Sequence, residues 1–259
     1  MASVVSDCEL LRYDGHVGVW DITKRRNELP RLEAMLKAHR QEVLCLRFNA
    51  HHQTFITGGN EHAIHVWSIS SYQQLARLEG HSAPVTCLAL DGNFLLSGAE
   101  DGVVHVWDLH SYMALATLKV HQAAVESLCV VPENGLLLSC STDRSVRVWD
   151  YGLGREVLVW NHPEEFRSLA MSRATGQVLA GTEQHHIIAF PFSEALAALQ
   201  RLHVRLAAEA AADAAGLAPA QTPAPAEAPA PAVPAHAVES TYNTLSLTES
   251  VKQTKSLNK

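Results

Sequence analysis

The sequence has none of the features that would place the chain in a membrane or on nucleic acid. It contains no apolar run of about 18 residues, so no membrane-spanning helix is expected. Met1–Leu10 lacks the basic region and apolar stretch of a secretory signal. Positive charge is also scarce, because 20 Lys and Arg face 27 Asp and Glu and give a net charge of −7. Nucleic-acid binding depends on neutralising phosphates, so this balance argues against such a partner.

The cysteines do not form an even set that would predict disulfide bonds. They are Cys8, Cys45, Cys87, Cys129 and Cys140. An odd number without a signal peptide favours reduced thiols and an intracellular, cytoplasmic protein. Cys45 and Cys87 each follow a histidine by six residues, and Ser127 and Ser168 take the same place later in the chain. A position shared by Cys and Ser requires a small side chain, so we expect packed thiols instead of a metal or redox site.

Motifs for catalysis and cofactor binding are missing too. The chain holds no nucleophile elbow, phosphate-binding loop or Cys-x-x-Cys pair. Its 15 histidines, which include His51-His52, His62, His65 and His185-His186, follow no known metal-ligand spacing. We therefore expect no catalytic residue, no metal and no cofactor.

The strongest positive signal is an internal period of about 41 residues. Tryptophans at Trp67, Trp107 and Trp149 are separated by 40 and 42 residues, and Phe190 follows 41 later. Histidines at His39, His81, His121 and His162 are separated by 42, 40 and 41. Two residue types thus keep one period at a nearly constant offset, which predicts a repeat architecture.

Each period divides into four short segments with the alternation of β-strands. Positions −3 and −1 before each aromatic residue are mostly β-branched, as in Val104 and Val106 before Trp107. Two apolar runs precede this segment and a fourth follows it, and turn sequences such as Asp91-Gly92-Asn93 and Asp101-Gly102 separate them. Four short antiparallel strands per period are typical of a propeller blade.

A set of four polar and aromatic residues recurs in three of the periods. The sets are His39, Thr57, Glu61 and Trp67; His81, Ser97, Asp101 and Trp107; and His121, Ser139, Asp143 and Trp149. A buried imidazole and a buried indole both need hydrogen-bond partners, which a hydroxyl and a carboxylate can supply. Three copies argue against a catalytic triad, since a hydrolase needs one site. We expect each set to be a structural tetrad that stabilises its own blade.

These residues resemble the WD-repeat β-propeller family. Gly80-His81 and Trp107-Asp108 match the GH and WD signatures, and Trp149-Asp150 repeats the second. The likeness covers residues 10 to about 192. Glu61 and Ser68 depart from the pattern in the first full repeat, and the last repeat has Ala180, Gln184 and Phe190 at the tetrad positions. We expect the network to be lost in that last repeat.

The predicted architecture is an all-β propeller portion over residues 1–193 with an incomplete ring. It has four recognisable four-stranded blades plus one partial blade, at approximately 39–80, 81–120, 121–161, 162–193 and, for the partial blade, 10–38. The resemblance implies seven blades, which would need roughly 290 residues. The chain is therefore expected to be a fragment of a longer protein, to pair with another propeller portion or a second copy of itself, or to close as a smaller ring. We favour the first.

The segments outside the repeats differ in character. Between Trp20 and His39 the chain has extra residues in Lys24–Ala38, where Pro30 can start a short helix with Leu32, Met35 and Leu36 on one face. This insert is either a docking element or a longer outer loop. Residues 194–215 predict an Ala-rich helix. Residues 216–259 predict a disordered Pro/Ala linker and a Ser/Thr-rich tail, either inert or a short binding or phosphorylation motif.

The predicted function is a non-enzymatic protein-interaction scaffold. The resemblance implies that residues just before the tetrad acid face the rim of the propeller, here Asn60, Glu100, Thr142 and Glu183, with Glu42, Pro84 and Ala124 beside them. The two glutamates at the first set of positions favour a basic partner segment. The stretch His162–Phe192 and the DGNFLLSG segment also resemble WD-repeat proteins of cilia and flagella, which would imply an axonemal role. The alternatives are a substrate receptor or G-protein-β-like adaptor and, in another class, an enzyme with a cryptic site.

Overall fold

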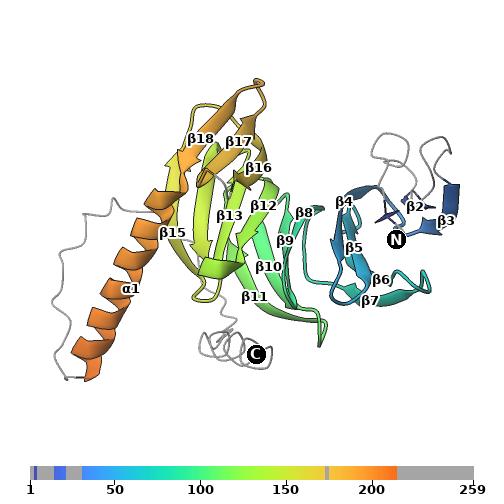
Figure 1. Ribbon diagram of the computed structural model, residues 1–259, viewed down its shortest axis with the longest axis horizontal. Helices are drawn as coiled ribbons and strands as arrows, with labels where there is room; N and C mark the ends of the chain where they lie inside the picture. Colours follow the sequence, from blue (N-terminus) through green and yellow to red (C-terminus); the bar gives the residue numbers. More distant parts are fainter. Residues whose placement is uncertain (1–2, 5–14, 22–30, 173–174, 215–259) are drawn as a thin grey trace, which may run out of the picture. The chain divides into compact units, whose positions relative to one another are not determined.

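The computed structural model describes residues 3–4, 15–21, 31–172 and 175–214. The chain divides into two compact units, Met1–Ala195 and Leu196–Lys259. The first unit contains all of the described strands (Figure 1). The predicted linker and tail, residues 216–259, lie outside the described residues, as do residues 24–30 of the extra segment after Trp20.

The strands form five antiparallel sheets that follow one another in chain order. The N-terminal sheet contains β1 (Ser3–Val4), β2 (His16–Asp21) and β3 (Arg31–Lys37). The first blade contains β4 (Val43–Asn49), β5 (Thr54–Gly59), β6 (Ile64–Ser68) and β7 (Gln74–Leu78). The second contains β8 (Val85–Asp91), β9 (Phe94–Ala99), β10 (Val103–Asp108) and β11 (Met113–Lys119). The third contains β12 (Val125–Val131), a 3-10 turn at Pro132–Asn134, β13 (Leu136–Ser141), β14 (Ser145–Asp150) and β15 (Arg155–Asn161), and the fourth contains β16 (Phe166–Ser172), β17 (Gln177–Thr182) and β18 (Ile187–Pro191).

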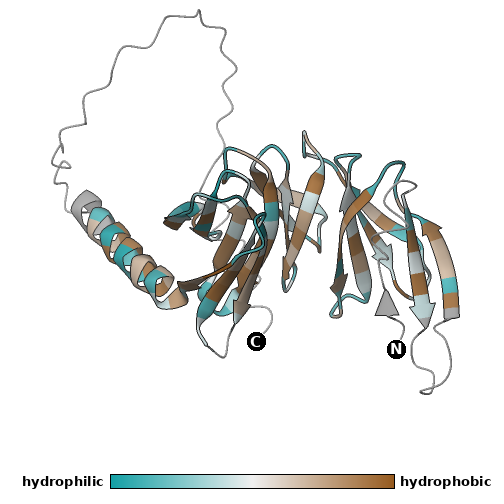
Figure 2. Ribbon diagram, turned by 90° about the horizontal axis from the view of Figure 1, so that it is seen from above, coloured by the Kyte–Doolittle hydropathy of each residue, from teal (hydrophilic) through white to brown (hydrophobic). Residues whose placement is uncertain are grey.

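Burial changes from strand to strand within a blade in the same way three times. Every residue of β5, β9 and β13 is buried, whereas β7, β11 and β15 are mostly exposed or half-buried. Figure 2 shows apolar strands joined by polar turns. In these three blades the second strand thus lies in the core, and the fourth faces solvent, as expected for a strand at a sheet edge.

Neighbouring blades contact each other through their first strands. β4 lies against β8, β8 against β12, and β12 against β16. Two thiols join these strands: Cys45 Sγ donates to the carbonyl of Val85 at 3.4 Å, and Cys87 Sγ to that of Val125 at 3.5 Å. Burial raises the pKa of the Cys87 thiol to about 12, so it stays protonated and can donate. The described sheets do not close into a ring.

The fourth blade has three strands, so the prediction of four four-stranded blades is wrong for this one. Helix α1 (Phe192–Ala214) begins directly after β18, where the other blades turn into a fourth strand. An Ala- and Leu-rich sequence without β-branched residues at its start favours helix over strand. The helix itself was predicted and is confirmed. Within the described ranges, no helix combines the length and apolar character that a membrane crossing needs.

The short helix predicted after Pro30 is also wrong. Arg31–Lys37 forms β3, which pairs along β2 from Asp21↔Arg31 to His16↔Lys37. Leu32 and Met35 are largely exposed there. Helical spacing of apolar residues is a weak local preference, and pairing to a neighbouring strand overrides it. The Trp-containing strands β6, β10 and β14 are each followed by a further strand. Comparison with those repeats predicts that Arg31–Lys37 is a strand too.

Candidate functional site

The histidine, hydroxyl and tryptophan of the first two tetrads are hydrogen-bonded in the same way. His39 Nε2 lies 2.7 Å from Thr57 Oγ1, which accepts the Trp67 indole N–H at 3.1 Å. His81 Nε2 lies 2.6 Å from Ser97 Oγ, which accepts the Trp107 indole N–H at 2.9 Å. In each of these blades one buried hydroxyl therefore contacts both the imidazole and the indole. It connects the histidine before the first strand to the tryptophan of the third strand.

The acidic member behaves differently in each blade. In the third blade Asp143 Oδ2 lies 2.9 Å from His121 Nδ1, and His121 Nε2 lies 2.8 Å from Ser139 Oγ, but the buried Trp149 indole nitrogen has no hydrogen-bond partner among the described residues. In the second blade Asp101 accepts from the Ser82 hydroxyl at 2.5 Å and from the Val103 backbone N–H at 3.1 Å instead of bonding His81. The three tetrads are thus variations on one network, not copies.

The fourth blade replaces the network with apolar contacts. Ala180 stands in the hydroxyl position and is completely buried beside Phe166 and Phe190. Phe190 stacks on Trp160 of the third blade with ring centroids 4.9 Å apart. Aromatic packing across the boundary between blades therefore takes the place of hydrogen bonds within one blade.

The predicted rim positions recur in a single backbone arrangement. The residue before the tetrad acid donates its N–H to the carbonyl of the residue before the first strand in all four blades: Asn60 to Glu42, Glu100 to Pro84, Thr142 to Ala124 and Glu183 to Glu165, at 3.0–3.2 Å. In the first blade the side chains pair too, since Asn60 Nδ2 donates to Glu42 Oε2 at 2.9 Å. The structure therefore brings Asn60, Glu100 and Thr142 together with the expected neighbours Glu42, Pro84 and Ala124, whereas Glu165, beside Glu183, was not predicted.

One arginine that was not predicted joins two blades at this rim. Arg167, the second residue of β16, donates to Glu126 at 2.9 Å and to Glu183 at 3.1 Å and lies 3.5 Å from Glu165. Burial raises the pKa of Glu126, and the guanidinium opposes that shift. Glu100 is exposed one blade away. Glu126 and Arg167 occupy equivalent positions in consecutive repeats, and comparing those positions in the sequence would have found them.

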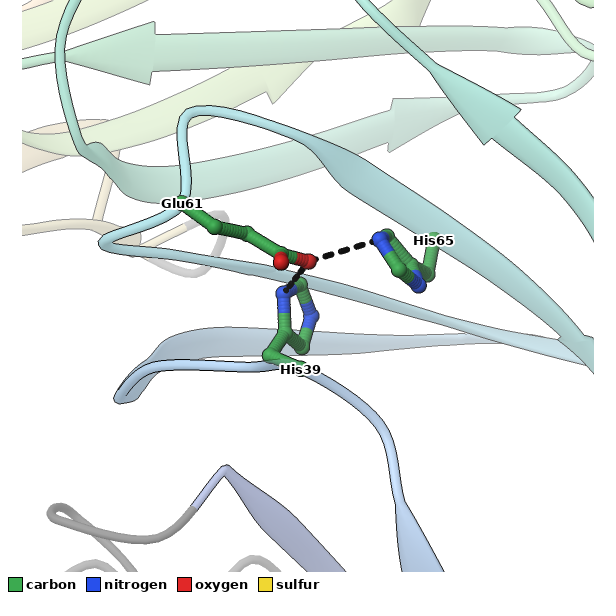
Figure 3. A group of neighbouring side chains, drawn as sticks. All are labelled: His39, Glu61 and His65. Atoms are coloured by element: carbon green, nitrogen blue, oxygen red, sulfur yellow. Dashed lines mark ion pairs between the residues drawn. The ribbon is translucent and has the colours of Figure 1, made fainter.

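A second group, in the first blade, combines two histidines and a carboxylate. Glu61 Oε1 lies 2.7 Å from both His39 Nδ1 and His65 Nε2 (Figure 3). The candidate ligand atoms of the three side chains lie within 4.8 Å of one another. His39 precedes β4, whereas Glu61 and His65 lie at and after the turn into β6, so spacing along the chain did not indicate the group. Burial lowers the pKa of His39 to about 4 and also lowers that of His65.

Comparison with known proteins agrees with the repeat. The family model of the WD domain, G-beta repeat, matches residues 30–68, 72–108 and 113–150. Each match starts at or near the last strand of one sheet and ends with the third strand of the next. The geometry and these matches together place the chain in the class of four-stranded-blade repeat proteins. Residues 30–68, 72–108 and 113–150 are thus similar to WD repeats.

Each similar curated protein matches only part of this chain. "Mitochondrial division protein 1" of Candida glabrata is 31% identical over 74 residues, which are 28% of this chain and 10% of that protein. The protein of the same name from Kluyveromyces lactis is 31% identical over 86 residues, 29% of this chain and 12% of that protein. "BEACH domain-containing protein A2" of Arabidopsis thaliana is 31% identical over 81 residues, 30% of this chain and 2% of that protein. The chain therefore matches about a tenth or less of these relatives.

Proposed function

We propose that this chain is a non-enzymatic scaffold that binds a basic segment of a protein partner on its rim. WD repeats in general imply protein interaction. The observation that carries the finer proposal is the repeated backbone hydrogen bond that holds Asn60, Glu100, Thr142 and Glu183 in equivalent places. Because the backbone at these positions is already held in place, binding of a partner does not have to order it.

The charge of this rim favours a cationic partner. Glu42, Glu100, Glu126, Glu165 and Glu183 surround it, and Arg167 is already engaged by three of these glutamates. Clustered carboxylates of one sign attract an opposite charge and speed its association. A Lys- or Arg-rich peptide would therefore find acceptors on neighbouring blades at once.

The experiment is a binding titration with two labelled peptides of equal length, one rich in Arg and Lys and one rich in Glu. Fluorescence anisotropy with the full chain should show binding of the basic peptide that weakens as salt is added. The double variant Glu100→Gln/Glu183→Gln should weaken it roughly three- to tenfold, because exposed ion pairs contribute about 0.2–1 kcal/mol each.

The matched control is Glu133→Gln. Glu133 is an exposed glutamate in the turn after β12, at the opposite end of that strand from Glu126. Glu133→Gln removes one negative charge, as the single variant Glu100→Gln does, and should leave binding unchanged. Equal losses for the rim and control variants would mean that net charge, not the rim, attracts the peptide.

We also propose that the open row of blades is completed by a further propeller portion or by a second copy of this chain. Unpaired strand edges associate readily. Light scattering coupled to size exclusion measures the mass directly. A monomer that stays folded and soluble at high concentration would contradict self-association.

For the place of action we propose the reducing interior of the cell, with the cilium as the specific site. Among the described residues, Cys45, Cys87 and Cys140 are free thiols, which supports the first part. The second rests on the likeness of His162–Phe192 to ciliary WD-repeat proteins. Imaging of the tagged chain in ciliated cells tests it, and exclusion of the chain from the axoneme would refute it.

A further inference from the structure

His39, Glu61 and His65 present three ligand atoms to a common point. His39 Nδ1 and His65 Nε2 each lie 2.7 Å from Glu61 Oε1. These three atoms are buried, yet none of them makes a hydrogen bond of normal geometry. In the third blade the equivalent His121 Nδ1 and Asp143 Oδ2 do form one, at 2.9 Å. Figure 3 shows both imidazoles directed at one carboxylate oxygen of Glu61. Such a convergence of ligand atoms suits a shared cation.

We propose that these three side chains bind a Zn²⁺ ion, with the fourth position taken by water. Two imidazole nitrogens and one carboxylate oxygen form a ligand set that zinc prefers, with three protein ligands and one open position. Zinc–ligand distances near 2.0–2.2 Å require neighbouring ligand atoms about 3.3 Å apart. The present 2.7 Å contacts therefore need to open by only about half an ångström.

The surroundings hold one imidazole in position. His39 Nε2 contacts Thr57 Oγ1 at 2.7 Å, and the Trp67 indole N–H fixes that hydroxyl from the other side at 3.1 Å. Metal-bound histidines generally have such a partner on the second nitrogen, which orients the ring. The tetrad of the first blade would thus orient a ligand as well as stabilise the fold.

The second and third blades do not bring two imidazoles and a carboxylate together in this way. The second blade has Asp101 and His105 at the equivalent positions, but Asp101 contacts Ser82 and Val103, and His105 Nδ1 lies 2.9 Å from Thr117 Oγ1. The third blade has Arg147 in place of the second histidine, and a guanidinium carries a positive charge and no lone pair for a metal. Only in the first blade does the longer Glu61 reach between two imidazoles.

The experiment uses the full chain, stripped of metal and titrated with Co²⁺ and then Zn²⁺. We expect one equivalent of Co²⁺ to give the visible absorption of four-coordinate cobalt, and Zn²⁺ to displace it. His65→Gln should weaken Zn²⁺ binding by more than about 100-fold, since loss of a ligand exceeds the 10–100-fold effect of an outer partner. His105→Gln, the equivalent change one blade on, should leave binding unchanged.

A second variant guards against loss of folding. Glu61→Asp restores the acid found in the next two blades, so circular dichroism and thermal unfolding without metal should match the wild type. Its shorter side chain should nevertheless abolish the cobalt absorption. The proposal is overturned if wild type and Glu61→Asp bind Zn²⁺ equally, or if His65→Gln and wild type do, since surface histidines would then be the binders.

Discussion

The third and fourth blades are neighbours with equivalent strands, yet their cores are held by different interactions. In the third blade a hydroxyl and a carboxylate contact the two ring nitrogens of His121. In the fourth, Ala180 lies among Phe166, Phe190 and Trp160, and the last of these belongs to the third blade. The hydrogen bonds of the third blade are formed within that blade, whereas the aromatic cluster of the fourth blade includes a side chain from the third. The fourth blade should therefore depend on the third more than the third depends on it.

The largest expected effect comes from Phe166→Ala. Phe166 is completely buried in the aromatic cluster, and truncation of such a side chain costs about 3–5 kcal/mol. Urea unfolding measures the loss, and hydrogen exchange should show it concentrated in β16–β18. Phe48→Ala, at a position 44% exposed, is the control and should cost under about 1 kcal/mol. Loss of protection spread evenly over all blades would contradict the proposed dependence.

Next in size is the effect of removing a tetrad carboxylate. Asp143→Ala removes the carboxylate that His121 Nδ1 contacts at 2.9 Å and leaves only the Ser145 hydroxyl, at 3.2 Å, so it should cost about 1–3 kcal/mol. Asp101→Ala should cost less, since Asp101 bonds no histidine and its partners, Ser82 and the Val103 N–H, lie nearer the surface. Thermal unfolding of both variants decides between them. Equal costs would mean that the shared turn, not the histidine contact, is what the acid stabilises.

Acid should weaken the first two blades selectively. Burial lowers the pKa of His39 to about 4 and that of His81 to about 3. Each histidine therefore binds fewer protons when folded than unfolded, so stability is constant above about pH 6.5 and falls as the pH drops toward 4. At pH 5 the expected loss is on the order of 1–2 kcal/mol per histidine. Urea unfolding at pH 7 and 5 measures it, and His81→Gln should flatten the dependence; an unchanged slope in that variant would contradict the assignment.

The smallest effect is expected for Ala180→Ser. It restores the hydroxyl of the other tetrads, but at a buried position lined by aromatic rings. A buried hydroxyl without a partner should destabilise by about 1 kcal/mol. The reverse change, Ser139→Ala, removes a hydroxyl that His121 contacts and should destabilise by a similar amount. A gain in stability from Ala180→Ser would show that His162 can still reach this position.

Spacing along the sequence predicted the repeats, the strands and the rim pairs, because these depend on a regular alternation and on turns of constant length. It did not predict that Asp101 would contact Ser82, nor that Glu61 would reach two imidazoles. Such choices depend on one methylene group and on ring orientation, which spacing does not describe. β3 was missed for a different reason: a local helical pattern gave way to pairing with β2.

The backbone hydrogen bond made by Asn60, Glu100, Thr142 and Glu183 keeps the same geometry whichever side chain stands at the position. It joins backbone atoms only, so Asn, Glu, Thr and Glu fill the same position on four blades with the same geometry. A substitution there changes what the blade offers to a partner at little cost to the blade itself. Each blade can therefore change the side chain at this position independently of the others, and the four blades present a short series of replaceable side chains.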